Sequence, residues 1–263
     1  MRKTALTITV STLVLGVFGA FLRWLQVINI FEPETGLATP GAGLSVALVV
    51  FSALAFAAMA VIAVLLRRRT VQSPDVEEAM RVRTPLPRVI AVICAVVFIF
   101  AGLEQMFTAG AASSPLMQRI FGAAALVSGA ALIVLPCRRE GGLHPLARSA
   151  ALWLPCFFCY WLVLAYRDNA QDPVQWRYLA YLLAIAMTAL GYYHLASWYF
   201  RRARTGWTLL FLQLAVYLDL CALSDEQGLW LKLMLAAAGV MLAVGEYLLI
   251  ANFREKPGAD EAG

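Results

Sequence analysis

The sequence predicts an all-α, polytopic transmembrane helix bundle of eight spans with both termini in the cytoplasm. Of its 263 residues, 62% are hydrophobic and only 14% are charged, whereas soluble domains average about 45–50% apolar and about 25% charged residues. The apolar residues fall in eight long stretches, and most basic residues lie in every second connection between them. A soluble domain is therefore excluded as a class, and the lipid bilayer is the first expected partner.

Each predicted span is an apolar run of about 20 residues, the length that crosses about 30 Å of hydrocarbon. Together the spans form a single transmembrane domain over residues 1–252, and the polar residues 253–263 are expected to form a disordered cytoplasmic tail. The eight spans cover residues 4–22, 44–66, 89–109, 118–136, 149–166, 178–200, 206–223 and 229–252.

Two of these spans have features that could argue against them. The first span follows basic residues, as a signal peptide would, but Phe18 and Ala20 give a poor cleavage site, so we expect a retained helix. The fifth span contains Pro155, which is expected to kink its helix, because proline removes one backbone donor. Neighbouring helices can satisfy the carbonyl group that such a proline leaves free.

Positive charge predicts the orientation of the bundle, because cytoplasmic loops of membrane proteins are rich in lysine and arginine. With the N-terminus inside, the inner segments hold 16 of the 21 basic residues, and the outer ones hold Arg23, Arg119, Arg167, Arg177 and Lys232. An odd number of spans would place one basic cluster outside. The net charge of +5 thus follows membrane topology, and no nucleic-acid partner is expected.

Five ionisable residues inside the predicted spans are the candidate intramembrane site: Glu104, His194, Asp219, Lys232 and Glu246. Such residues are costly in hydrocarbon and therefore suggest function. All five lie toward span ends, where long side chains reach the interface. The favoured interpretation is structural pairing, of Asp219 or Glu104 with Lys232 or Arg23 outside and of Glu246 with an inner arginine; a polar pathway is the alternative.

The connection between the last two spans predicts one particular pair. It is only five residues long, residues 224–228, so the two helices are expected to be antiparallel neighbours. Asp219 and Lys232 lie at similar distances from this connection. We therefore expect them to approach one another or to share a polar partner.

Two helical faces combine small residues with polar ends. One face carries Thr12, Gly16, Gly19 and Arg23, and the other carries Lys232, Ala236, Gly239, Ala243 and Glu246. Spacings of three and four place such residues on one side of a helix, and small residues allow helices to approach closely. These faces are expected to pack within the bundle, with a polar-ended pathway as the alternative.

The outer loops supply a second group of candidate residues: Arg23, Glu32, Glu34, Arg167, Asp168 and Asp172. Proline and glycine fix turns among them. We expect these charges to cross-link the loops into a cap, and an entry site for a cation or solute is the alternative.

Two loop segments resemble a known group of proteins. The runs FEPETGL, from Phe31, and YRDNAQDP, from Tyr166, resemble outer loops of small multi-pass membrane proteins of Clostridia-type bacteria. That resemblance extends over most of the chain and implies a multi-pass protein of a bacterial plasma membrane. It implies no activity and no role for any residue.

The expected function is that of a non-enzymatic integral membrane protein, transporter-like for a small solute or ion. The ionisable residues within spans favour this class. A structural, sensory or partner-binding membrane subunit is the alternative, favoured by the short loops and small-residue faces. An intramembrane enzyme is disfavoured, because phosphate-binding, metalloprotease and serine-hydrolase motifs are missing from the sequence. No metal or cofactor is expected.

Overall fold

The computed structural model describes residues 2–31, 43–71, 79–80, 84–111, 114–136, 138–139, 142–143, 145–170, 174 and 177–255. Within these ranges, eight helices are long and apolar enough to cross a membrane. They are α1 (Arg2–Ile30), α2 (Gly43–Arg69), α4 (Leu86–Thr108), α5 (Pro115–Val134), α6 (Ala147–Asn169), α7 (Leu179–Tyr199), α8 (Thr205–Ala222) and α9 (Leu229–Asn252). The predicted all-helical class and the eight apolar spans are therefore confirmed.

Shorter elements lie between and after these helices. A 3-10 helix of one turn, η1 (Ala109–Ala111), follows α4. Strand β1 (Thr70–Val71) pairs with β4 (Arg254–Glu255), and β2 (Arg138–Arg139) pairs with β3 (Gly142–Leu143). The start of the expected C-terminal tail is thus paired with the strand that follows α2, and residues 256–263 lie outside the described residues.

The largest difference from the predicted boundaries is at α1, which continues to Ile30 instead of ending near residue 22. The apolar run ends at Arg23, but Arg23 and Gln26 are buried by other parts of the bundle. Tertiary contacts therefore extend the helix beyond its hydrophobic length. Helix α6 continues through Pro155.

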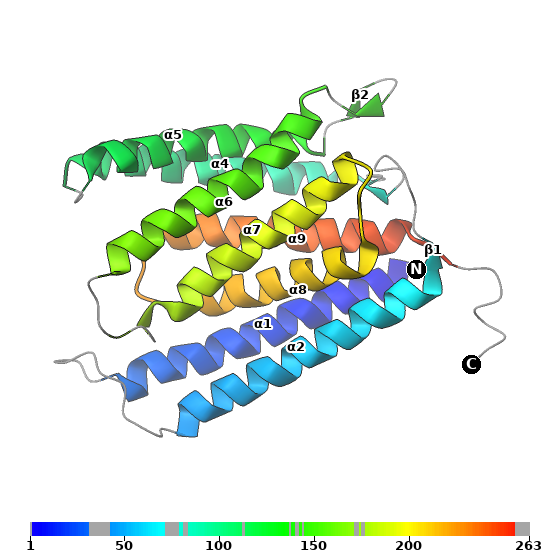
Figure 1. The fold of residues 1–263 in the computed structure, drawn as a ribbon, viewed down its shortest axis with the longest axis horizontal. Coiled ribbons are helices and arrows are strands. Elements are labelled where there is room, and N and C mark those ends of the chain that lie inside the picture. Colours follow the sequence, from blue (N-terminus) through cyan, green and yellow to red (C-terminus); the bar gives the residue numbers. More distant parts are fainter. Residues whose placement is uncertain are drawn as a thin grey trace.

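The bundle is layered, with α4 and α5 along one side, α1 and α2 along the other, and α9 between them (Figure 1). Helix α9 packs against α1, α4, α7 and α8, and α8 packs against α1, α2 and α7. These two helices are the most buried of the eight, while α2 is the least buried. Gln213 and Asp219 of α8 and Glu246 of α9 are consequently held inside the protein.

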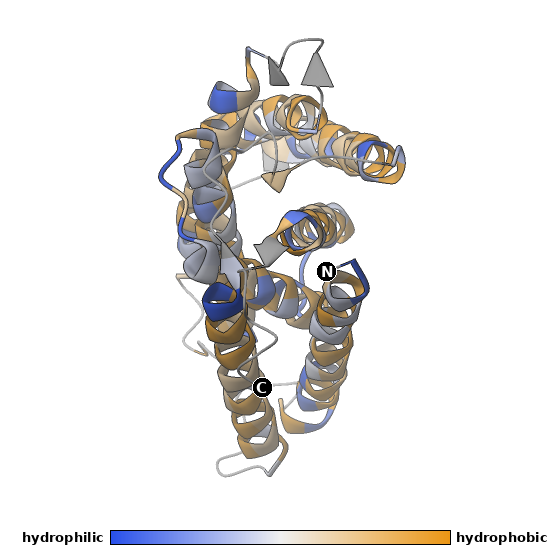
Figure 2. Ribbon diagram, turned by 90° about the vertical axis from the view of Figure 1, so that its right-hand side faces the viewer, coloured by the Kyte–Doolittle hydropathy of each residue, from blue (hydrophilic) through white to orange (hydrophobic). Residues whose placement is uncertain are grey.

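The basic start of α1 and most other basic helix ends lie at one end of the bundle. The N-terminus, the β1–β4 pair, β2 and the α7–α8 connection lie together at the right in Figure 1. Figure 2 looks onto this end and shows hydrophilic segments among predominantly hydrophobic helices. The described helix ends that carry arginines assigned by sequence to the inner side thus lie at one end of the bundle. This end is called the inner end, and the opposite end is called the outer end.

The outward helix surfaces are apolar, as a lipid-facing surface requires. Val10, Val17 and Phe18 of α1 and Ile93 and Phe100 of α4 are among the many exposed large hydrophobic side chains. Soluble monomers rarely expose apolar patches beyond a few hundred Å². This surface agrees with the excess of hydrophobic residues in the composition.

Candidate functional site

The predicted small-residue face of α1 packs against α8. Successive buried residues of α1 are three or four positions apart, from Ala5 to Ile30. A β-carbon added at Gly16 would lie 2.5 Å from Leu220, and one added at Gly19 would lie 2.7 Å from the hydroxyl of Tyr217. Glycine at these positions lets α1 approach α8 closely enough for its polar residues to reach the two central helices.

Glu246 lies at the inner end of this contact and is completely buried. Its Oε1 accepts hydrogen bonds from the Gln213 amide of α8 at 2.9 Å and from the Thr12 hydroxyl of α1 at 3.3 Å. The other carboxyl oxygen, Oε2, has no hydrogen-bond partner, and neither has Oε1 of Gln213. Three helices therefore enclose a carboxyl group with neutral donors alone.

Asp219 forms a second buried carboxyl site nearer the outer end. Thr188 of α7 donates a hydrogen bond of 2.6 Å to Oδ1 of Asp219, and Oδ2 has no hydrogen-bond partner. Across the interface lies Gly239, where an added β-carbon would be 2.9 Å from Oδ2. Gly239 and Glu246 are seven residues apart on α9, which places the two carboxyl groups about 10 Å apart along the helix.

The expected pairing of Asp219 with Lys232 is not found among the described residues. Asp219 faces Gly239, two turns beyond Lys232 on α9, because packing against α7 and α9 turns its side chain toward Thr188. Neither of the ion pairs between described residues includes Asp219, Lys232, Glu104 or Glu246. Hydroxyl and amide groups, instead of basic side chains, are the partners of the carboxyls buried within helices.

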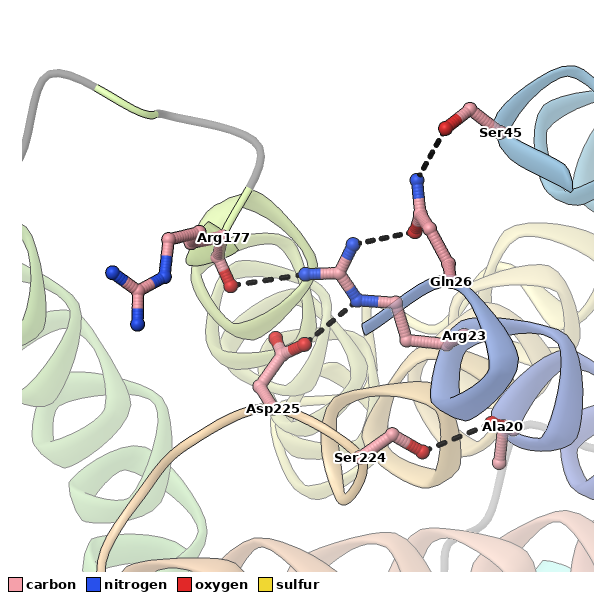
Figure 3. A network of polar contacts seen from close by, with 7 residues as sticks. All are labelled: Ala20, Arg23, Gln26, Ser45, Arg177, Ser224 and Asp225. Carbon is pink, nitrogen blue, oxygen red and sulfur yellow. Dashed lines mark hydrogen bonds and ion pairs between the residues drawn. The ribbon is translucent and has the colours of Figure 1, made fainter. Parts of the chain in front are cut away.

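Arg23 organises a polar network at the outer end of the bundle (Figure 3). Its guanidinium donates to Asp225 at 2.7 Å, to Gln26 at 2.6 Å and to the backbone carbonyl of Arg177 at 2.9 Å. Gln26 in turn donates to Ser45 at the start of α2. Both charged side chains of the Arg23–Asp225 pair are buried, so the network joins α1, α2, α7 and the α8–α9 connection.

Two further contacts support this outer network. Ser224 donates a hydrogen bond of 2.9 Å to the carbonyl of Ala20, and Arg177 forms an exposed ion pair with Glu226 at 2.5 Å. Burial raises the pKa of Asp225 above its ordinary value, and the neighbouring Arg23 acts in the opposite direction. The predicted loop cap therefore includes Arg23, but its buried acidic partner is Asp225.

The other predicted outer-loop residues do not join this network through any described contact. Arg167 contacts the sulfur of Met117, and Asp168 lines a separate pocket of about 60 Å³ with Gln105, Gln118 and Tyr181. Glu32, Glu34 and Asp172 lie outside the described residues.

Glu104 belongs to a half-buried amide cluster near the outer end of α4. Gln105 donates a hydrogen bond of 2.5 Å to Glu104, and Gln118 of α5 donates to Gln105. The nearby backbones are in close contact, since a β-carbon on Gly122 would lie 2.5 Å from the carbonyl oxygen of Gly102. The described partners of Glu104 therefore come from α4 and α5, whereas Glu246 is held between α1, α8 and α9.

The two remaining predicted span residues lie at opposite ends of the bundle. His194 stacks on Phe211 of α8, with ring centroids 4.7 Å apart, and lines an open hollow with Arg202 and Arg204. Lys232 is partly exposed near the outer end of α9. The five span candidates thus do not form a single site.

Sequence reasoning missed Thr188 and did not assign Gln213 to a site with Glu246. Both are polar residues within apolar runs, and this was the available signal. Their partners could not be identified, because they lie on helices whose relative rotation the spacing does not determine.

Comparisons with known proteins add no relative. No protein-family model, no curated protein and no solved structure matches the chain.

Proposed function

We propose that the chain is a multi-pass integral membrane protein of a bacterial plasma membrane, with both termini in the cytoplasm, and that it is a non-enzymatic, proton-coupled transporter of a small solute or ion. The eight apolar helices support membrane insertion. The collection of basic helix ends at one end of the bundle supports the orientation. The resemblance of the two outer-loop runs to Clostridia-type proteins supports the bacterial assignment.

The observation that carries the transport proposal is the pair of buried carboxyl groups with neutral partners. Asp219 and Glu246 each have one hydrogen-bonded and one unpartnered oxygen. An ionised carboxylate buried without a counter-charge costs several kcal/mol, so each site favours a bound positive charge. The donors already present satisfy one oxygen of a neutral acid, and a proton on the other oxygen neutralises the group.

Proton release would change the balance of forces at the α1–α8–α9 contact. A neutral Glu246 is stable between Thr12 and Gln213, whereas an ionised one gains free energy from contact with water. Loss of the proton thus favours opening of the contact toward solvent, and uptake favours closure. This difference between two states is what couples proton binding to the movement of a solute.

The proposal is tested with purified protein in liposomes that contain a pH-sensitive dye. In one experiment, a potassium diffusion potential is imposed across the liposome membrane. In a second, a panel of amino acids, sugars and inorganic ions is added to the external solution. Wild-type protein is expected to carry protons inward, and Glu246→Gln, which cannot release a proton, is expected to abolish this flux. The matched control Glu226→Gln, at an exposed acid, should leave it intact. Absence of proton flux under every condition would overturn the transport proposal.

A structural, sensory or partner-binding subunit is the second candidate, favoured by the tight packing around the buried acids. Two small pockets lined by described residues measure about 50 and 60 Å³, and neither includes Asp219 or Glu246 in its lining. Native mass spectrometry of the detergent-solubilised protein distinguishes the candidates: a stoichiometric protein partner favours the second, and a bound small solute favours the first.

A further inference from the structure

An open hollow of about 790 Å³ lies beside the end of α7 and the start of α8, away from the buried carboxyl groups. Its polar lining includes His194, Arg202 and Arg204, and its apolar lining includes Leu152 and Phe200. Pockets that bind small molecules measure about 300–1,000 Å³. The hollow therefore has room for a ligand the size of a lipid headgroup.

Within the part of the chain that the structure describes, the arginines of this hollow have no acidic partner. Arg202 and Arg204 are exposed, and the ion pairs between described residues involve other arginines, Arg23 and Arg177. His194 adds a nitrogen-bearing ring close to them. Most surface arginines can be explained by solvation alone, but two in a single hollow beside a histidine form a site whose charge matches an anion.

The backbone holds these two arginines in a constrained connection. Arg201 adopts a left-handed conformation with φ of 57°, which is uncommon for a residue with a side chain. The amide of Arg202 donates to the carbonyl of Ser197 at 3.0 Å, which closes the end of α7. Arg204 is extended immediately before α8 begins at Thr205. The short connection thus directs both arginines to the same hollow.

The apolar side of the hollow indicates the kind of anion. Leu152, Tyr193 and Phe200 are exposed on the outer surface of the helices, beside the cationic groups. A phosphate with attached acyl chains would place its charge against the arginines and its chains along this apolar surface. Basic pockets between transmembrane helices bind anionic lipid headgroups in this way.

We propose that this hollow binds the phosphate group of an anionic phospholipid, such as phosphatidylglycerol. Guanidinium groups bind phosphate with paired hydrogen bonds. No acidic side chain of the described residues lines the hollow to pair with the ammonium group of a zwitterionic headgroup, so a lipid with net negative charge is preferred. The site depends on membrane insertion of the helices but not on transport.

The test measures lipid retention by the full-length protein in detergent, using native mass spectrometry with phosphatidylglycerol or phosphatidylcholine. Wild type is expected to retain one more phosphatidylglycerol molecule than the variant Arg202→Gln/Arg204→Gln, and no such difference is expected with phosphatidylcholine. The matched control Arg68→Gln/Arg69→Gln removes two exposed charges from the end of α2 and should behave as wild type. Equal losses in both double variants would show non-specific charge attraction and overturn the proposal.

Two further measurements separate lipid from free phosphate and do not depend on the folding of the glutamine variant. Phosphatidylglycerol, but not phosphatidylcholine, should slow hydrogen exchange of wild type in residues 197–204 and raise its melting temperature. Inorganic phosphate that gives the same protection without lipid would assign the hollow to a free phosphate and overturn the lipid proposal. Unchanged exchange with phosphatidylglycerol would also overturn it. Flux through the liposomes is not part of these readouts, so failure of transport leaves this result interpretable.

Discussion

At the residue scale, the notable feature is that the carboxyl groups buried within helices are held by neutral donors. Thr188 contacts Asp219, and Thr12 and Gln213 contact Glu246. An ion pair would compensate a permanent charge, whereas these donors suit a group whose charge changes. The buried Arg23–Asp225 pair, by contrast, lies where α1 meets the α8–α9 connection and has the geometry of a fixed ion pair.

The first prediction tests whether Glu246 is neutral in the folded protein. Glutamine has the shape of a protonated glutamic acid, so Glu246→Gln is expected to cost at most about 1 kcal/mol of stability. Glu246→Ala leaves the Gln213 amide without its acceptor and should cost about 1–3 kcal/mol, with a further loss from the cavity. Thermal unfolding in detergent at neutral pH measures both. Equal destabilisation by the two substitutions would mean that the ionised carboxylate is required.

The second prediction concerns the buried pair at the outer end. Removing one member leaves the other as an uncompensated buried charge, so Arg23→Gln and Asp225→Asn should each cost about 3–5 kcal/mol. The double variant should cost less than the sum of the two losses, because neither charge is then stranded. A double-mutant cycle on unfolding free energy measures this coupling. The exposed pair Arg177–Glu226 is the control and should show coupling of about 0–1 kcal/mol; strictly additive losses for Arg23 and Asp225 would contradict the prediction.

At the element scale, α1 shows how one helix can be both lipid-facing and part of the core. Its buried residues follow a strict alternation of three and four positions, and the remaining faces are exposed and apolar. The stripe contains glycine in the middle and polar residues at Thr12 and Arg23. Thr12 and Arg23 are about 11 residues apart on α1, and close packing places them in two different polar sites.

The third prediction tests the packing of α1 against the end of α8. Ser224 contacts the backbone of Ala20 at 2.9 Å, whereas Phe21 is exposed. In a protein whose native cysteines are replaced by alanine, the pair Ala20→Cys/Ser224→Cys should form an oxidative cross-link in membranes. The control pair Phe21→Cys/Ser224→Cys should not. A protease site inserted within residues 72–78 separates the two positions, so only cross-linked chains stay joined on a denaturing gel, and cross-linking of the control pair alone would refute this packing.

At the scale of the whole molecule, helix ends that are far apart in the sequence share one basic surface. The ends of α2, α7 and α9 and the start of α1 lie together (Figure 1). This arrangement places the hollow beside His194, the β1–β4 pair and the basic residues Arg2 and Lys3 at one end. The Arg23 network (Figure 3) lies toward the C-terminal end of α1, which Figure 1 places at the opposite end of the bundle.

The fourth prediction is the topology of this molecule in the membrane. Reporter fusions after Pro74, Gly142, Arg204 and Gly263 should report the cytoplasm, and fusions after Gly36, Asp168 and Glu226 should report the outside. The physical reason is the location of 16 of 21 basic residues on the first set of segments. Alkaline phosphatase and a fluorescent protein, which are active on opposite sides, serve as paired reporters. An outside signal after Gly263, or an inside signal after Gly36 or Asp168, would contradict the eight-span topology.

The sequence by itself determined the helical class, the eight apolar spans and the inward face of α1. These properties depend on local quantities: the length of an apolar run and the spacing of small residues along one helix. It also identified Asp219 and Glu246 as unusual, because a charge in an apolar run is visible without any partner. Sequence and structure therefore agree best for properties that belong to one segment.

Only the tertiary structure decided which residues meet. Similar depth suggested Lys232 as the partner of Asp219, but the rotation of α8 against α7 and α9 turns Asp219 to Thr188 and Gly239. Arg23 pairs with Asp225 because buried contacts extend α1 beyond its apolar run. Depth follows from counting residues, whereas the direction of a side chain depends on the packing of all neighbouring helices at once, and this information is not carried by any single segment.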